Sequence, residues 1–223
     1  MSRDFDWPEL LFLFGALRWT VVLSLIAFVV GGIGGLVLAI ARTSSHTILR
    51  WLAAVYIGVM QGTPVLMQLF LVYYGLAVLT GLRIDAWPAV TLAFTMYAAA
   101  FLGEIWRGAI QAIPQQQWEA AAAIPLAPAA RMRYVILPQA FRIAIPPTVG
   151  FLVQLIKGTS IASIIGFVEL TRAGQLFVNV TFQPMVVYPL VAVLYFTLCW
   201  PLSLMALRLE RRIDAAIGIK EHL

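Results

Sequence analysis

Long apolar stretches, separated by short segments that carry the charges, form the main pattern of this chain. Residues 19–41 contain no ionisable side chain and include Gly31 and Gly35, about one helical turn apart. Because a helix needs about 20 apolar residues to cross a bilayer, the pattern predicts five membrane-spanning helices. The two glycines predict close packing of the first helix on another helix. We expect one transmembrane domain, 1–223, with spans at about 17–41, 52–80, 88–113, 139–167 and 186–207.

The second and fourth spans are predicted to be irregular. The stretch between Arg50 and Arg83 is too long for one straight crossing at about 1.5 Å per residue. It should therefore hold one crossing and an irregular part. Pro146-Pro147 and Lys157-Gly158 are expected to interrupt the fourth stretch, because proline removes a helical hydrogen bond and glycine weakens a helix.

Composition places the chain in a membrane. Apolar residues make up 62% of it, charged residues 11%, and the mean hydropathy is +0.92, whereas a soluble domain carries about 25% charged residues. Its exterior must therefore meet lipid or another apolar chain. A single cysteine, Cys199, excludes an intrachain disulfide, and His46 and His222 are far apart in sequence. We therefore expect no metal site.

The distribution of positive charge predicts the orientation, because Lys and Arg collect in cytoplasmic loops. The predicted cytoplasmic segments carry Arg42, Arg50, Arg131, Arg133, Arg142, Arg208, Arg211, Arg212 and Lys220. In the opposite segments acidic residues offset the basic ones: Arg3, Arg18, Arg83 and Arg172 against Asp4, Asp6, Glu9, Asp85 and Glu169. The amino terminus is thus expected outside the cell and the carboxyl terminus in the cytoplasm.

The cytoplasmic segment between the third and fourth spans, 115–137, does not have the composition of a simple connector. Glu119–Ala123 is a strong helix former. Pro125 should end that helix, Pro128 should begin another, and Pro138 should end the second. The result would be a helical hairpin outside the bilayer, which could insert into a groove of a partner protein. A helix resting on the membrane surface is an equally good interpretation of the composition.

Polar residues near the predicted helix breaks are candidates for a transport path. Ionisable groups inside a bilayer usually face a bundle interior or water, and broken helices in transporters present half-helix ends to solutes. We expect a polar pocket formed by Gln61, Thr63, Glu104, Lys157, Thr159 and Ser160. An alternative for Glu104 is a simple pair with Arg107 on one helix face.

Six short motifs resemble, in order, those of the membrane subunits of ABC importers, in the branch that carries polar amino acids. Over about residues 15–210 they are Gly62-Thr63-Pro64, Glu104-Ile105-Trp106-Arg107-Gly108, Glu119-Ala120-Ala121, Leu137-Pro138-Gln139-Ala140, Lys157-Gly158-Thr159-Ser160 and Glu169-Leu170-Thr171. The family counterparts are R-G-T-P, E-x-x-R-G, E-A-A, L-P-Q-A, K-D-T-S and E-L-T. This chain departs from them at Gln61 and Gly158, and Pro125 replaces the glycine that follows E-A-A. The lost aspartate at Gly158 makes a basic amino acid a less favoured cargo.

The resemblance implies a permease subunit that moves a polar amino acid or similar solute through the inner membrane. Such a subunit would have no catalytic site or cofactor of its own, since ATP would be bound by partner ATPases. The resemblance also implies a second permease copy or paralogue and an extracytoplasmic solute-binding protein as partners. It assigns contact with the ATPase to a coupling helix within 115–137, and the residues concerned are Glu119, Ala120, Ala121, Pro125, Leu126 and Pro138.

Two other classes remain as alternatives. A channel would also have broken, glycine-rich helices, and ATP-dependent flux would distinguish the two classes. An intramembrane hydrolase needs a nucleophile with a base or a metal cluster, and the sequence offers no such set. Neither the identity of the cargo nor the choice between homodimer and heterodimer follows from the sequence.

Overall fold

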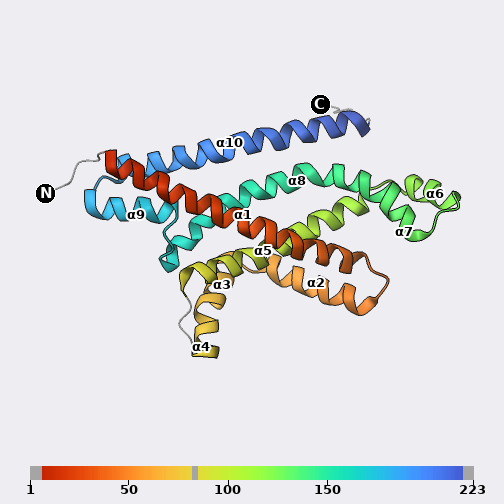
Figure 1. The fold of residues 1–223 in the computed structure, drawn as a ribbon, viewed down its shortest axis with the longest axis horizontal. Helices are drawn as coiled ribbons and strands as arrows, with labels where there is room; N and C mark the ends of the chain where they lie inside the picture. The colour runs from red at the N-terminus through yellow and green to blue at the C-terminus, as the bar shows by residue number, and fades with distance from the viewer. Residues whose placement is uncertain (1–6, 82–84, 218–223) are drawn as a thin grey trace.

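The computed structural model describes residues 7–81 and 85–217, and this part of the chain is almost entirely helical (Figure 1). The all-α prediction is confirmed. The elements are α1 (Trp7–Thr43), α2 (Thr47–Gly62), α3 (Val65–Phe70), the π-helical η1 (Leu71–Gly75), α4 (Leu76–Thr80), α5 (Ala86–Gln111), α6 (Gln115–Ala123), α7 (Pro128–Arg131), the π-helical η2 (Met132–Ile136), α8 (Leu137–Gly158), the 3-10 helix η3 (Thr159–Ile165), α9 (Leu170–Thr181) and α10 (Pro184–Ile217). Several residues used above lie outside the described ones: Arg3, Asp4, Asp6, Arg83, Lys220 and His222.

Four helical stretches among the described residues are long and apolar enough to cross a membrane, and a bent pair of helices can supply a fifth crossing. The bent pair joins Thr47–Gly62 to Val65–Thr80 at an angle of 106°. The predicted irregularity of the second span is therefore confirmed, and the chain bends at Gly62-Thr63-Pro64 between two helices. The first and last helices are longer than the apolar stretches from which they were predicted, since α1 begins at Trp7 and α10 extends to Ile217.

Helices α1 and α5 pack against each other at glycines, as predicted from Gly31 and Gly35 of the first span. A Cβ built at Gly31 would lie 2.6 Å from Ala98 Cβ, and one built at Gly35 would lie 2.9 Å from the backbone nitrogen of Gly103. Real side chains do not approach so closely, so only glycine allows this backbone contact. The function of Gly31 and Gly35 in helix packing is confirmed.

Prolines interrupt the fourth stretch less than predicted. A continuous helical stretch runs from Pro128 to Ile165, so the prediction that Pro138 ends a helix is wrong. Pro138 lies in the first turn of α8, directly after η2, where its missing N–H is tolerated. Pro146 and Pro147 lie inside α8 without ending it, because neighbouring helices support proline within a membrane helix. The predicted change at Gly158 is confirmed, since α8 gives way there to η3.

Two buried clusters hold different parts of the fold together. The larger one joins α1, α3, α5, α8 and η3 around Phe94. A second one joins α1, α9 and α10 through residues such as Leu13, Leu170 and Val191. Outside these clusters many large apolar side chains are exposed, among them Ile33 on α1 and Phe196 on α10. Such a surface suits lipid or a second membrane chain.

Figure 1 shows that the long helices run side by side and that α4 projects away from them. The α1–α2 turn, the α6–α7 segment and the carboxyl-terminal part of α10 lie at one end. Helix α9 and the beginning of α1 lie at the other end. The predicted coupling element and α9 are thus separated by the length of the bundle.

Candidate functional site

The α6–α7 segment forms a short helical element between the two long helices α5 and α8. Pro114 precedes α6 and Pro128 begins α7, which confirms the predicted role of Pro128. Helix α6 ends at Ala123, two residues before Pro125, because the residue before a proline disfavours helical geometry. The Arg131 Nε donates to the carbonyl of Leu126 at 2.8 Å and closes the turn.

Most residues of this element are exposed, and Ala121 is the exception. Glu119 and Ala120 are exposed, and Gln115 Nε2 donates to Glu119 Oε1 at 2.9 Å along the helix surface. The Ala121 side chain is only 3% exposed, so it faces the rest of this chain. Glu119 and Ala120 are therefore accessible from outside this chain, whereas a larger residue at Ala121 would first disturb α6 itself.

The element is attached to the bundle through a small apolar cluster. Ile113, Ile136 and Ala140 are buried together at its base. Gln139 Nε2 lies 3.3 Å from Gln117 Oε1 and links α8 to α6. These contacts join the element to the end of α5 and the beginning of α8.

The break between α2 and α3 holds two of the predicted path residues, Gln61 and Thr63. Both are exposed, and the Thr63 hydroxyl donates to the carbonyl of Val59 at 2.7 Å. Gln68, which the sequence did not single out, lies on the other side of the break. Its Nε2 is 2.7 Å from the carbonyl of Met60 and 3.0 Å from Thr63 Oγ1. Gln68 thus satisfies carbonyls that the end of α2 leaves free.

The predicted residues Lys157, Thr159 and Ser160 surround the junction of α8 and η3. Thr159 is buried, and its hydroxyl donates to the carbonyl of Ile156 at 2.7 Å. The Ser160 hydroxyl donates to the carbonyl of Lys157 at 2.8 Å. Both hydroxyls therefore satisfy the end of α8 locally, which is the alternative that a structural role predicts.

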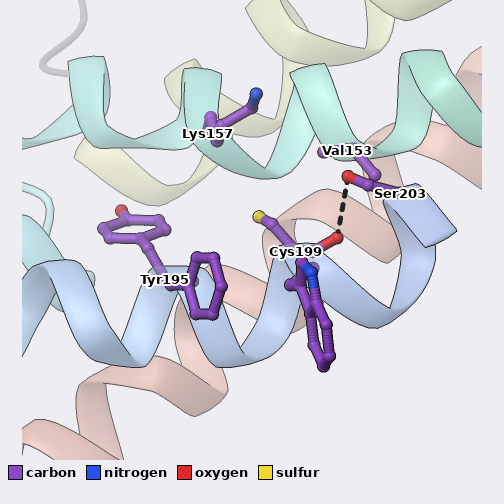
Figure 2. A pocket seen from close by; sticks show the side chains of 7 residues that line it. Val153, Lys157, Tyr195, Cys199 and Ser203 are labelled. Carbon is purple, nitrogen blue, oxygen red and sulfur yellow. Dashed lines mark hydrogen bonds between the residues drawn. The ribbon is translucent and has the colours of Figure 1, made fainter.

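A cavity of about 250 Å³ lies between α8 and α10 beside this junction. It is lined by Val153, Lys157, Tyr195, Phe196, Cys199, Trp200 and Ser203. Figure 2 shows the Lys157 amine pointing away from α10, so its aliphatic stem and not its charge faces the aromatic side chains. The lining of the cavity is thus largely apolar and aromatic, and it includes the hydroxyl-bearing Tyr195 and Ser203 and the thiol-bearing Cys199.

Glu104 lies at a different level from Lys157. Gly158 lies against Phe94 of α5, because a Cβ added at Gly158 would be 3.7 Å from Phe94 Cε1. Glu104 lies ten residues further along α5, which is roughly 15 Å at the rise of a helix. Glu104 is paired with Arg107, whose Nε donates to Glu104 Oε2 at 2.8 Å. The structure therefore separates Glu104 from the junction at Lys157 and pairs it with Arg107.

The sequence did not predict the polar cluster around Glu169, a residue that it identified only within E-L-T. Glu169 is 0% exposed and caps α9, accepting bonds from the backbone N–H groups of Thr171 at 2.9 Å and Arg172 at 2.8 Å. The Tyr195 hydroxyl donates to Glu169 Oε2 at 2.7 Å. Burial raises the pKa of the Glu169 carboxyl above its usual range, and these bonds oppose that shift.

Comparisons with known proteins agree on one class. A family model for the "binding-protein-dependent transport system inner membrane component" matches residues 31–215. The L-cystine transport system permease protein TcyB of Bacillus subtilis (strain 168) is 38% identical over 213 residues, which cover 95% of this chain and 89% of TcyB. The glutamine transport system permease protein GlnP of Escherichia coli (strain K12) is 35% identical over 208 residues, covering 93% and 95%.

A solved structure gives the same result. The crystal structure of an amino acid ABC transporter with histidines has a TM-score of 0.86 and 33% sequence identity to this chain. The match covers 94% of this chain and 100% of the other. The arrangement of helices in Figure 1 is therefore one that a known transporter subunit adopts.

Proposed function

Because the chain belongs to the family of binding-protein-dependent transport system inner membrane components, we propose that it forms the path for a polar amino acid or a related small solute. Members of this family are multi-pass permease subunits of ABC importers, and the family implies an ATPase and a solute-binding protein as partners. The cargo is inferred from relatives that are named for cystine, glutamine and arginine.

The observation that carries the mechanism is the exposure of the α6–α7 element. The element has a proline at the start of each helix, an alanine-rich α6 and a buried apolar cluster beneath it. These features give it a defined shape, which supports a function in docking. We infer that Glu119, Ala120, Pro125 and Leu126 meet an ATPase subunit, and that the buried Ala121 supports them from behind. Pro138 would keep its place in this element as part of the stiff connection to α8.

We propose that the end of the bundle with α6 and α7 lies in the cytoplasm and that the end with α9 lies outside. The end that holds α6–α7 also holds Arg42 at the end of α1, Arg131 and Arg208. Positive charge favours the cytoplasmic side, which is also where an ATPase works. Helix α9 and the amino terminus would then face the outside, toward the solute-binding protein.

For the transport path we propose the region where α3, α8 and η3 meet the first half of α5. Leu69 of α3, Phe94 of α5 and Ala162 of η3 lie in one buried cluster, which brings the break at Gln61 and Thr63 toward the junction at Lys157, Thr159 and Ser160. The cavity between α8 and α10 adjoins that junction. We keep Glu104 as a candidate for the cytoplasmic part of the path, beside Arg107 and within electrostatic reach of Arg42.

Uptake into vesicles tests this function. The permease would be reconstituted with a candidate ATPase and solute-binding protein from the same organism and supplied with radiolabelled cystine, glutamine, arginine or histidine. We expect ATP-dependent uptake of at least one of the first two, because the cavity lining carries no carboxylate for a basic side chain. Uptake that is equally fast without ATP would contradict the proposal and support a channel.

The assembly proposed is a pair of such permeases, identical or paralogous, with two ATPase subunits. Large apolar side chains remain exposed on α1 and α10, among them Ile33 and Phe196, and such surfaces suit lipid or a second membrane chain. Mass measurement of the purified complex would separate one kind of permease from two.

A further inference from the structure

Glu169 does more than cap α9. Capping uses its bonds to the backbone N–H groups of Thr171 and Arg172, and these contacts lie within the same turn of chain. Its third bond is the one to the Tyr195 hydroxyl, 26 residues away on α10. The Thr171 hydroxyl lies 3.1 Å from the same Tyr195 oxygen. The Tyr195 hydroxyl is therefore held by two residues at the start of α9, Glu169 and Thr171.

Tyr195 is also a wall of the cavity between α8 and α10. Figure 2 shows its ring beside the Cys199 thiol, with the hydroxyl pointing away from that thiol. The ring thus closes one side of the cavity, while the hydroxyl reaches back to Glu169. A change of the Tyr195 side chain to another χ1 rotamer would move its hydroxyl away from Glu169 and change the shape of the cavity.

Helix α9 carries Glu169 as part of a fixed unit. The backbone N–H of Leu170 donates to Thr20 Oγ1 of α1 at 3.1 Å, and both residues are buried. Gly174 lies so close to α10 that an added Cβ would be 2.8 Å from Val191 Cγ2. A shift of α9 would therefore move the Glu169 carboxylate together with its bond to Tyr195.

We propose that Glu169 is a positioning residue for transport, which holds the Tyr195 ring as the wall of the cavity and links this wall to the position of α9. The inference rests on the proposed function, because it takes the cavity as part of the solute path. A protein that docks on α9 from outside could then change the cavity without touching it. Glu169 itself need not contact the solute.

The lone cysteine of the chain gives a direct test. Cys199 lines the cavity next to Tyr195 and is 8% exposed, so its rate of reaction with N-ethylmaleimide in the detergent-solubilised complex reports on the wall. Tyr195→Phe removes only the hydroxyl, and Glu169→Gln keeps the shape of the capping side chain. We expect each to raise the labelling rate about two- to tenfold, which corresponds to the loss of one net hydrogen bond.

A matched control is Thr197→Val on the same helix. The Thr197 hydroxyl donates to the carbonyl of Val193 within α10 and is exposed, so its removal should leave Cys199 labelling unchanged. The double variant of Glu169→Gln and Tyr195→Phe should label no faster than the faster single variant, because both break the same contact. A role of Glu169 in helix capping alone would leave the labelling of Tyr195→Phe at the wild-type rate.

Transport gives the second readout. In reconstituted vesicles both single variants should raise the KM for uptake by about two- to tenfold, with the maximal rate of ATP hydrolysis retained. If Glu169→Gln does not fold, Tyr195→Phe decides alone. Unchanged Cys199 labelling and unchanged KM in a transporting complex would overturn the inference. If the wild-type complex shows no ATP-dependent uptake, the proposed function fails, while the labelling experiment still decides whether Glu169 holds the wall.

Discussion

The two ends of the bundle are built in opposite ways. At one end α9 is capped by the buried Glu169, bonded through Leu170 to Thr20 and packed at Gly174 on α10. At the other end α6 and α7 are exposed along most of their length and rest on a small cluster around Ile136. The chain satisfies the first end with its own contacts. The second end leaves most of its surface without contacts from this chain, and for this reason we propose it as the surface that a partner protein covers.

Overpacking of α9 should give the largest effect. Gly174→Leu places side-chain atoms where Val191 already lies, and such overpacking destabilises by roughly 1–3 kcal/mol. We expect a clear fall in the thermal midpoint of the purified protein. Gly150→Leu on α8 is the matched control, since an added Cβ there meets nothing within 4 Å. An equal loss in both variants would mean that α9 is not specifically packed.

Removal of the two glutamates should distinguish the ends by a somewhat smaller effect. Glu169→Ala leaves the backbone N–H groups of Thr171 and Arg172 without their acceptor and removes the bond from the Tyr195 hydroxyl, and loss of a cap costs about 0.5–2 kcal/mol. Glu119→Ala removes only a surface bond to Gln115 and should leave the thermal midpoint almost unchanged. If Glu119→Ala were the more destabilising change in the isolated permease, the comparison between the ends would be wrong.

A large side chain on the exposed face of α6 should impair coupling but not folding. Ala120→Trp would obstruct docking of the ATPase and reduce solute uptake by roughly tenfold, since overpacking of an interface costs 1–3 kcal/mol. The isolated permease should keep its thermal midpoint, because Ala120 is exposed. Val180→Trp at the exposed part of α9 is the control and should leave ATPase assembly intact.

The smallest effect concerns pH. Burial raises the pKa of Glu169 above 4.5, so the stability contributed by its protonated form is full below pH 4.5 and is lost as pH rises through the higher folded pKa. Tyr195, the nearby Arg172 and Lys157 beside the cavity are the other titratable groups around it. Glu169→Gln should flatten the pH dependence of the thermal midpoint. Glu119→Gln should keep the wild-type slope.

Local spacing predicted those features of the fold that depend on neighbouring residues. Gly31 and Gly35 lie on one helix face whatever the partner, and Pro128 begins α7 because a proline suits a first turn. The resemblance to ABC permeases, based on motifs in order, is confirmed by the family match over residues 31–215. The predictions that Pro138 ends a helix and that Pro146 interrupts one are wrong, because tertiary packing decides whether a proline ends a membrane helix.

The parts of the site that depend on distant contacts could not be predicted. Leu170 bonds to Thr20 across 150 residues of chain, and Tyr195 lies within an apolar run that gives no local sign of its partner. A single glutamate between apolar neighbours at Glu169 was the available signal. The sequence grouped Glu104 with Lys157 by their charge alone, whereas their separation along the bundle follows from the path of α5 and α8.

Site-specific cross-linking tests most directly whether the α6–α7 element is the part held by the ATPase. In a Cys199→Ala background, Glu119→Cys on α6 and Asn179→Cys on α9 would each be treated with a short bifunctional thiol reagent in the assembled transporter. Both positions are exposed, and they lie at opposite ends of the bundle. The account predicts a cross-link from position 119 to the ATPase subunit and none from position 179. An active complex that gives no cross-link from position 119 to the ATPase subunit, or that gives one from position 179 to this subunit, would contradict the account.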